Sequence, residues 1–560
     1  MLLRRLFSSR RALLLSACAI VLFGYVGLVS ANSDAALTAA ANGEVNDKTF
    51  ARLEWRSIGP AIFDGRVADV EGVPGDPNIV FVGAADGGVW KTTNGGVTWK
   101  PIFERLGTHS VGDIALEPNN PDVIWVGTGE GNARNSVSFG DGVYKSTDGG
   151  KTWQNMGLKD TMYITRIVVH PTNPNIVFVG ALGHNFGPNE ERGVYMTTDG
   201  GKTWTKTLFV DAEHGISDMD IDPQNPNILY AGVWRFERKP WTFTSGGEKG
   251  GVFRSIDGGR TWAKLTNGLP AGDAGRIGVD IYRKDSKIIY AIYEHATESG
   301  VYRSDDKGET WKKQSITNPR PAYYSQIRVD PSNADRVYVL GASWYVSDNG
   351  GKNFQNSPFG RIHGDYHALW INPTNSNHLL TGSDGGIHFS YDKGKTWDFI
   401  NTIALGQFYE VGFDFRKPYW VYGGLQDNGS WGAPVFTLNA TGLSNDEWIR
   451  VGGGDGFYNV VDPKDPNTIY TESQNAGIAR LNLLSGESKF IRPQSEDGSR
   501  ERYRFEWNSP ILISPHNNRR IYLGGNRLFI SNDRGDNWTT ITSDLTKAIN
   551  RDRLPIMGVE

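Results

Sequence analysis

Cysteine is almost absent from this sequence of 560 residues, and the single one, Cys18, lies in an N-terminal stretch with the character of an export signal. The body that follows therefore has no disulfide, thiol nucleophile or cysteine zinc site to offer. It also has no basic run of five or more residues, and the formal net charge of −4 leaves no electrostatic footprint for nucleic acid. Walker loops, nucleophile elbows and His-Glu-x-x-His motifs are missing too, which argues against nucleotide hydrolysis, α/β-hydrolase chemistry and zincin chemistry.

The first 31 residues read as export machinery. Basic residues precede an apolar run from Ala12 to Val29, and Val29-Ser30-Ala31 offers a small-residue cleavage site. We predict that residues 1–31 are a signal peptide or, if uncleaved, an N-terminal anchor, because about 18 apolar residues is the lower limit for spanning a bilayer. Leu15-Ser16-Ala17-Cys18 resembles a bacterial lipoprotein box, so lipidation of Cys18 is a further alternative. Residues 32–50 are expected to be a flexible linker, and the body is expected to be extracytoplasmic, either periplasmic or secreted.

What the sequence does contain is glycine, aromatic residues and repeats. It has 69 glycines and 12% aromatic residues, a composition that indicates an ordered, turn-rich globular protein. A turn-and-strand unit reads Pro74-Gly-Asp-Pro-Asn-Ile-Val-Phe-Val-Gly83. It recurs from Pro118, Pro171, Pro223, Pro331, Pro373 and Pro515, with weaker copies around Tyr290, Tyr422 and Tyr470. The chain therefore contains about ten repeat units.

A second motif, Ser/Thr-x-Asp/Asn-x-Gly-x-Thr/Asn-Trp/Phe, follows the first in eight of the ten units. Each unit also divides into four short runs of alternating apolar residues bounded by turn residues, which are strand signals. No window shows a sustained helical period. Four strands every 40 to 60 residues predict an all-β fold, a β-propeller of four-stranded blades over residues 51–545, followed by a C-terminal tail at 546–560 that leads into a missing region or ends the chain.

The acidic or amide residue of the second motif is expected to be structural. Its side chain can accept backbone N–H groups across a tight turn, while glycine supplies a positive φ and tryptophan packs beneath the hairpin. These positions are Asn94, Asp148, Asp199, Asp257, Asp306, Asn349, Asp392 and Asp533.

Ser-Thr-Asp148-Gly-Gly-Lys-Thr-Trp153 and its copies resemble the Asp box, or BNR repeat. With the Pro-x-Asn-Pro turns, they are most similar to the sortilin-like and xyloglucanase-like glycosyl hydrolase branches of Asp-box propellers. The resemblance implies one ten-bladed ring of sortilin type, or a seven-bladed ring plus part of a second. It does not fix an activity. Sialidase activity would need an arginine triad, and although Arg66, Arg166 and Arg276 begin inner strands, the Phe/Tyr-Arg-Ile-Pro signature is missing.

Function is expected on the face that carries the variable loops. The second to fourth units have long insertions whose polar and aromatic residues could bind a sugar or a peptide. The binding candidates are Glu130, Arg134, His184, Trp234, Arg238 and Trp241. The alternative for the aromatic residues is a self-packed loop that covers a blade edge.

Four aspartates adjoin inner strands and are candidates for catalysis. They are Asp86, Asp384, Asp427 and Asp455. Glycoside hydrolysis needs two carboxyl groups separated by roughly 5 to 9.5 Å. The xyloglucanase resemblance implies Asp86 as one of them, in a turn one residue shorter than the family's, and Asp384 loosely as the second. The alternative is that each Asp-Gly pair is an ordinary turn.

His363-Gly-Asp365-Tyr-His367 places three potential metal ligands at alternate positions. In an extended segment these side chains share a face, as the ligands of a divalent metal would. Three ligands from one strand are strained for a tetrahedron, so a hydrogen-bonded structural cluster is the alternative. No cofactor is required by the sequence.

The sequence therefore predicts an exported sortilin-like Asp-box propeller that acts as a peptide- or glycan-binding or assembly module. The alternative is an extracellular glycoside hydrolase of xyloglucanase type that uses paired aspartates. A peptide or polysaccharide is the expected partner, with no nucleic acid, and with membrane contact only through an uncleaved or lipidated N-terminal segment.

Overall fold

The computed structural model describes residues 50, 53, 55–132, 134, 137–356, 362–440, 442–495, 502–550 and 553–554. The chain divides into two units, Met1–Ile58 and Gly59–Glu560. In the first unit, residues 50, 53 and 55–58 are described, and none of them lies in a helix or strand. The predictions of a signal peptide, an anchor or a lipidated Cys18 fall outside the described residues. All described strands lie in the second unit.

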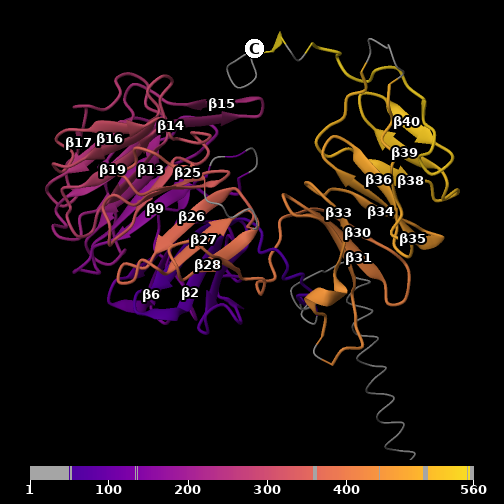
Figure 1. The fold of residues 1–560 in the computed structure, drawn as a ribbon, viewed down its shortest axis with the longest axis horizontal. Helices are drawn as coiled ribbons and strands as arrows, with labels where there is room; N and C mark the ends of the chain where they lie inside the picture. The colour runs from indigo at the N-terminus through magenta and orange to yellow at the C-terminus, as the bar shows by residue number, and fades with distance from the viewer. Residues whose placement is uncertain are drawn as a thin grey trace, which may run out of the picture. The chain divides into compact units, whose positions relative to one another are not determined.

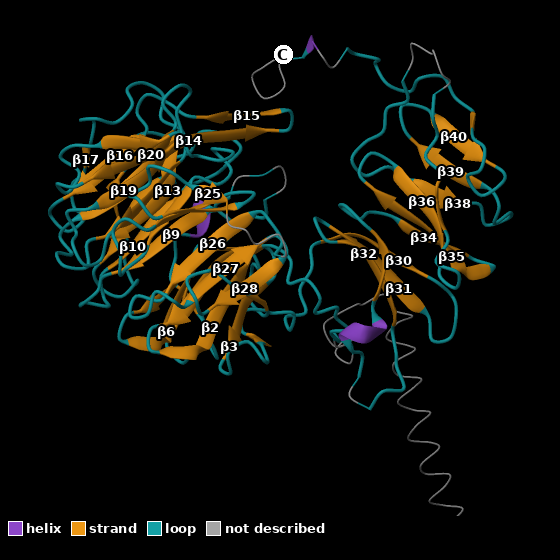
Figure 2. Ribbon diagram, in the orientation of Figure 1, coloured by secondary structure: helices purple, strands orange, loops and turns teal. Residues whose placement is uncertain are grey.

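The second unit contains ten antiparallel sheets, each built from consecutive strands (Figures 1 and 2). This number equals the number of repeat units in the sequence. Sheet one contains β1 (Val67–Val73), β2 (Asp76–Ala84), β3 (Gly88–Thr92) and β4 (Lys100–Pro101), and sheet two contains β5 (Val111–Glu117), β6 (Asn120–Thr128), β7 (Val143–Ser146) and β8 (Gln154–Asn155). Sheet three contains β9 (Ile164–Val169), β10 (Val177–Ala181), β11 (Gly193–Thr197) and β12 (Thr205–Leu208). Sheet four contains β13 (His214–Ile221), β14 (Leu229–Lys239), β16 (Gly251–Ser255) and β17 (Ala263–Lys264), and β15 (Thr242–Ser245) pairs with the end of β14.

The remaining six sheets follow the same plan. Sheets five to seven are β18 (Ile277–Ile281), β19 (Ile289–Tyr293), β20 (Gly300–Ser304), β21 (Lys312–Ser315); β22 (Gln326–Val329), β23 (Val337–Leu340), β24 (Trp344–Ser347), β25 (Gln355–Asn356); and β26 (Tyr366–Ile371), β27 (Leu379–Ser383), β28 (Gly386–Ser390), β29 (Asp398–Phe399). Sheets eight to ten are β30 (Phe408–Phe413), β31 (Trp420–Leu425), β32 (Gly429–Pro434), β33 (Ile449–Gly452); β34 (Asn459–Asp462), β35 (Asp465–Ser473), β36 (Gly477–Asn482), β37 (Ser488–Phe490); and β38 (Ile511–Ile513), β39 (Ile521–Gly524), β40 (Leu528–Ser531), β41 (Thr539–Thr540). The described helices are two short 3₁₀ turns, η1 (Lys159–Thr161) and η2 (Asn445–Glu447).

The first seven sheets close on themselves. From β1 to β22 each inner strand packs beside the next, β26 contacts β23 of the sheet before it, and β1 lies against β26 and β27. Val67 and Val82 of sheet one share a buried cluster with Ala368, Leu380 and Ile387 of sheet seven. Sheets eight to ten then pack on one another through β30, β34 and β38. Among the described residues, these contacts define two groups of sheets, one to seven and eight to ten.

Apolar side chains between neighbouring sheets form the core. Phe81 and Val89 of sheet one pack on Ile114, Ile124 and Val126 of sheet two, all at most 1% exposed. The glycine that ends each turn-and-strand motif serves this packing. A Cβ at Gly127 would lie 2.4 Å from Ile164 Cγ2 of the next sheet, so a side chain there would separate the two sheets.

Candidate functional site

The Asp-box side chains are held within their own hairpin turns. Thr152 Oγ1 donates to one carboxylate oxygen of Asp148, while the N–H groups of Lys151 and Thr152 donate to the other at 3.0 and 2.9 Å. Led by the Thr152 hydroxyl, these bonds lower the pKa of Asp148 to about 2. A second hydroxyl, from the Ser or Thr two residues before the box residue, donates to its side-chain oxygen at Asn94, Asp148, Asp199, Asp257, Asp306, Asn349, Asp392 and Asp533. The box residues are thus engaged in turn structure.

A buried arginine joins sheet one to sheets two and seven. Arg66, directly before β1, is 1% exposed; its Nε donates to Glu130 Oε1, and its Nη1 donates to both carboxylate oxygens of Asp384 at 3.1 and 3.2 Å. The same Nη1 donates to the Tyr323 hydroxyl at 2.6 Å. Burial opposes the ionisation of Glu130, but Arg66 and Arg134 outweigh it and hold the pKa of Glu130 below its usual value. Glu130, a predicted ligand-binding residue, is therefore buried and forms an ion pair with Arg66.

Asp384 is an internal anchor at the seam between sheets seven and one. It is 4% exposed, and His367 Nε2 lies 2.9 Å from its Oδ1. Burial alone would raise the pKa of Asp384, yet Arg66 and His367 hold it well below its usual value. Asp384 is therefore ionised and paired, and it does not have the environment of a proton-donating carboxyl.

A pocket of about 420 Å³ opens beside this buried network. Arg134 reaches it with its guanidinium 3.7 Å from Asp86 and hydrogen-bonded to Gln426 Oε1 at 3.1 Å. Phe408 and Tyr409 of β30 also line it and are 44% and 39% exposed. The Asp86 carboxylate is 37% exposed, and its burial raises its pKa above the usual value. The structure thus brings predicted binding and catalytic residues, Arg134 and Asp86, together with aromatic rings that the sequence did not single out.

Asp427 and Asp455 lie next to each other after β31 and β33. The Asp427 N–H donates to Asp455 Oδ1 at 2.9 Å, and Asp427 adopts a left-handed backbone with φ of 62°. Burial raises the pKa of Asp427 to about 7, and the charges of Asp384 and Asp455 add to the rise. A carboxyl group with a pKa near 7 beside the ionised Asp384 is partly protonated at neutral pH, an environment that suits a general acid.

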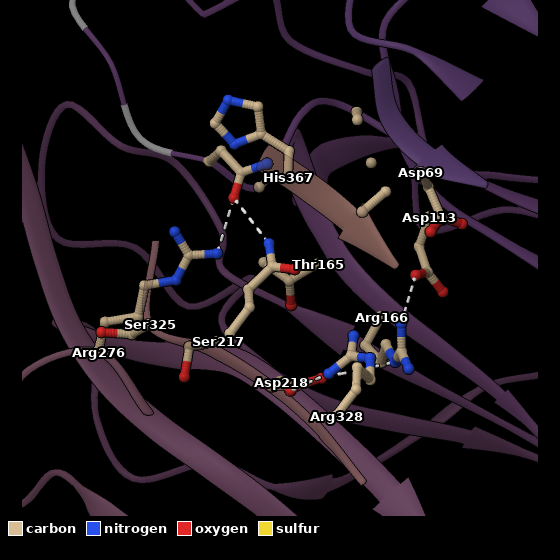
Figure 3. A pocket seen from close by; sticks show the side chains of 16 residues that line it. Asp69, Asp113, Thr165, Arg166, Ser217, Asp218, Arg276, Ser325, Arg328 and His367 are labelled. Atoms are coloured by element: carbon tan, nitrogen blue, oxygen red, sulfur yellow. Dashed lines mark hydrogen bonds and ion pairs between the residues drawn. The ribbon is translucent and has the colours of Figure 1, made fainter. Parts of the chain in front are cut away.

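A small polar pocket, hereafter the channel, lies among the inner strands of the seven-sheet ring (Figure 3). Residues of β1, β5, β9, β13, β22 and β26 line it, together with Arg276 directly before β18. Asp113 Oδ1 lies 3.2 Å from Arg166 Nη1, and Asp113 Oδ2 accepts the Ile167 N–H at 2.6 Å. Despite this arginine, burial and the neighbouring Asp69 raise the pKa of Asp113 to about 8. Asp113 therefore retains its proton at neutral pH despite the nearby Arg166, and it titrates together with the carboxylates around it.

The long loops of sheets two to four form a packed wall with its own apolar cluster. Trp234 is 0% exposed within that cluster, and its Nε1 donates to Ser245 Oγ at 2.9 Å. The prediction that Trp234 stacks on a ligand is therefore wrong, because its indole faces are packed. Arg238 is 9% exposed and lies over the Phe243 ring, and His184 contacts the Asp160 carbonyl oxygen at 2.7 Å. Trp241, at the turn between β14 and β15, is 66% exposed and remains open to a ligand.

The structure also corrects the metal hypothesis. Among the described residues, no group of three or more His, Cys, Asp or Glu side chains is arranged to hold a metal ion. His363 contacts the Asp427 carbonyl oxygen at 3.2 Å, Asp365 accepts the Tyr324 hydroxyl, and His367 faces Asp384. Asp365 has a φ of 62°, so the segment is not extended there and the three side chains diverge. They form parts of the structural cluster given above as the alternative.

Sequence reasoning missed the Arg66 network and the channel carboxylates. In the sequence, Arg66 is recognisable only as the start of an inner strand, and Tyr323 lies in no motif. A signal for the channel was present: Asp69 and Asp113 interrupt apolar inner-strand runs, where a charged residue must meet a partner on burial.

Comparisons with known proteins agree with this architecture. The family model Sortilin-Vps10, described as sortilin, neurotensin receptor 3, matches residues 87–208. The vacuolar protein sorting/targeting protein 10 of Schizosaccharomyces pombe is 29% identical over 136 residues, which are 24% of this chain and 8% of that one. The match therefore spans only a small part of that relative.

Solved structures extend the likeness to most of the chain. The GH74 xyloglucanase from Xanthomonas campestris has a TM-score of 0.53 at 15% identity, covering 87% of this chain and 81% of its own. A GH74 enzyme from Niastella koreensis has a TM-score of 0.50 at 17% identity, covering 87% and 80%. No helix in the described part of the chain is long and apolar enough to span a bilayer. In fold, the chain is therefore an Asp-box β-propeller of the sortilin and GH74 type.

Proposed function

We propose that this chain is an exported propeller module that binds a glycan or peptide chain in the pocket between Arg134 and β30. The observation that carries the proposal is the combination of exposed Phe408 and Tyr409 rings with Asp86, Arg134 and Gln426 around one opening. Flat aromatic rings bury the apolar face of a sugar or side chain, and the polar groups fix its orientation. Export rests on the leader-like residues 1–31.

Isothermal titration calorimetry against β-glucan oligosaccharides and a panel of extended peptides tests this proposal. Wild-type protein is expected to bind at least one class, and Tyr409→Ala is expected to weaken that binding by about tenfold, or 1.4 kcal/mol. Phe186→Ala is the matched control, since Phe186 is a 60% exposed aromatic residue on a loop of sheet three. Equal affinities of wild type and Tyr409→Ala, or no binding by the wild type, would contradict the proposal.

Glycoside hydrolysis is the second candidate, and the environment of Asp427 supports it. In this proposal Asp427 donates the proton to the leaving oxygen, since its raised pKa of about 7 leaves a substantial fraction of it protonated at neutral pH. Asp86, which is partly exposed and lines the pocket together with Gln426 next to Asp427, would be the second carboxyl group. Reducing-sugar release from β-glucans by the wild type, by Asp427→Asn and by Asp86→Ala tests it. The exposed Asp398→Asn is the control. Absence of release from every glucan in the panel would leave binding as the activity.

A further inference from the structure

A cluster of hydrogen-bond acceptors lies where the inner strands of sheets eight, nine and ten converge. Glu410 is in β30, Glu472 is near the end of β35, and Asn508 lies shortly before β38. Glu472 Oε1 accepts the Ser509 N–H at 2.7 Å, while Asn508 Nδ2 donates to Glu410 Oε1 at 3.2 Å. Both carboxyl groups therefore face the same short segment.

Two acceptor atoms of the cluster lack a hydrogen-bond donor within the described part of the chain. Glu472 is 1% exposed, yet among the described residues its Oε2 has no hydrogen-bond partner. Asn508 Oδ1 is also buried, and it also has no hydrogen-bond partner among the described residues. No ion pair recorded within the described part of the chain joins Glu410 or Glu472 to a lysine or arginine. Leaving a buried carboxylate oxygen without a donor is costly, so this arrangement calls for a donor from outside.

Aromatic rings stand beside these acceptors. Tyr409 packs on Phe457 with ring centroids 4.7 Å apart, and Trp507 lies against the Tyr409 hydroxyl. Trp507 is 51% exposed and Tyr409 is 39% exposed, so both rings present part of their surface to solvent beside the cluster. Tyr458 adds its hydroxyl next to Glu410. Carboxylates together with open aromatic faces suit a cation better than a neutral or anionic group.

We propose that Glu410, Glu472, Asn508 and Trp507 form a binding site for a protonated primary amine, such as the side chain of a lysine in a partner peptide. The ammonium group donates to Glu472 Oε2 and Asn508 Oδ1, and its alkyl stem lies on Trp507. The site is separate from the Asp86 pocket in its polar residues, so it does not depend on the function proposed above.

The site is also sensitive to pH. Burial raises the pKa of Glu472 to about 8, and Glu410 adds to the rise. The groups around Glu472 are Glu410 on β30, Tyr458 before β34, and the backbone N–H groups of Tyr458, Ala476 and Ser509, which act to lower its pKa. The ammonium therefore binds more tightly as Glu472 loses its proton, and affinity is expected to rise by about tenfold between about pH 6.5 and 8.5.

Two capped tripeptides provide the test, Gly-Lys-Gly and its isosteric neutral analogue with norleucine in place of lysine. Saturation-transfer NMR on the full chain is expected to detect the lysine peptide with a millimolar or lower Kd and the norleucine peptide at least about tenfold more weakly. Glu472→Gln is expected to abolish this preference and its pH dependence. Glu487→Gln is the control because Glu487 is exposed on the turn between β36 and β37 and is not part of the proposed site.

Folding is checked by thermal melts, and Trp507→Leu and Glu410→Gln supply readouts should Glu472→Gln not fold. Equal binding of the two peptides, unchanged binding in Glu472→Gln, or no binding of the lysine peptide up to about 10 mM would each overturn the proposal. None of these outcomes bears on Asp86 or Arg134, so failure here is distinguishable from failure of the Asp86 pocket.

Discussion

The channel carboxylates are expected to make the ring less stable as the pH rises, and Asp113 shows the size of the effect. It is 3% exposed, and its pKa is raised to about 8, mainly by burial. An unfolded chain releases this proton near pH 3.9, so between about pH 4 and 8 the folded state holds a proton that the unfolded state has lost. Unfolding then releases a proton, and a rise in pH favours it.

The magnitude follows from the width of that window. Each pH unit inside it removes about 1.4 kcal/mol of stability for one fully shifted group, so about 4 kcal/mol is lost between about pH 5 and 8. Asp69, which burial raises to a pKa of about 6, adds a smaller loss in the lower part of the same window. Because the carboxylates share a channel, these figures describe the titration of the cluster.

Asp113→Asn is the perturbation. Asparagine keeps an oxygen for the Ile167 N–H, which Asp113 binds at 2.6 Å, but cannot titrate. Melting temperatures followed by circular dichroism between about pH 5 and 8 are expected to fall with pH in the wild type by several degrees, and to fall less steeply in the variant. Asp122→Asn, at an exposed position, is the control. A melting temperature that is flat or rises over this range, or identical slopes in wild type and Asp113→Asn, would refute the reasoning.

Three further outcomes are expected. Arg66→Met should lower the free energy of unfolding by about 3 to 5 kcal/mol in urea titrations, because it leaves Glu130 and Asp384 buried without their cation. A loss below about 1 kcal/mol would mean that other contacts hold sheet one against sheet seven. Trp234→Ala should lower the free energy of unfolding by about 3 to 5 kcal/mol in the same assay, because the Trp234 indole is packed. Trp241→Ala should change it by no more than about 0.5 kcal/mol, because Trp241 is 66% exposed. Equal effects of the two variants would place Trp234 on the surface. Dialysis against EDTA should leave the melting temperature unchanged and metal analysis should give less than one equivalent, because His363, Asp365 and His367 contact different partners; a bound equivalent lost together with stability would restore the metal hypothesis.

Sequence reasoning reached the repeat architecture because the signal is local. A box such as Ser146 to Trp153 contains its whole hydrogen-bonded turn, so the spacing of its residues carries the structure. Gly127 is similar, since a strand position that tolerates no Cβ shows in the sequence as a recurring glycine. These features needed no knowledge of how the sheets meet.

The site was less accessible because it depends on contacts between distant units. Arg66 and Asp384 are separated by more than 300 residues, and only the closure of the ring brings them together. Glu410 and Glu472 likewise meet through the packing of sheets eight to ten, with no motif at either position. The metal hypothesis for His363, Asp365 and His367 was wrong because it assumed an extended backbone. The positive φ of Asp365 turns the chain there, so the three side chains do not share a face.

Every described sheet of this protein is made from one uninterrupted stretch of chain, and among the described strands none is exchanged between sheets one and seven. A complete sheet can therefore be gained, lost or replaced by a genetic event that respects the connections between sheets, without leaving a neighbour short of a strand. What such an event must preserve is the side-chain chemistry at the two new junctions, such as the arginine that meets an acid across the seam. Diversification of the loops and growth in the number of sheets are thus separable in this architecture, and each can proceed without rebuilding the hydrogen-bonded ladders.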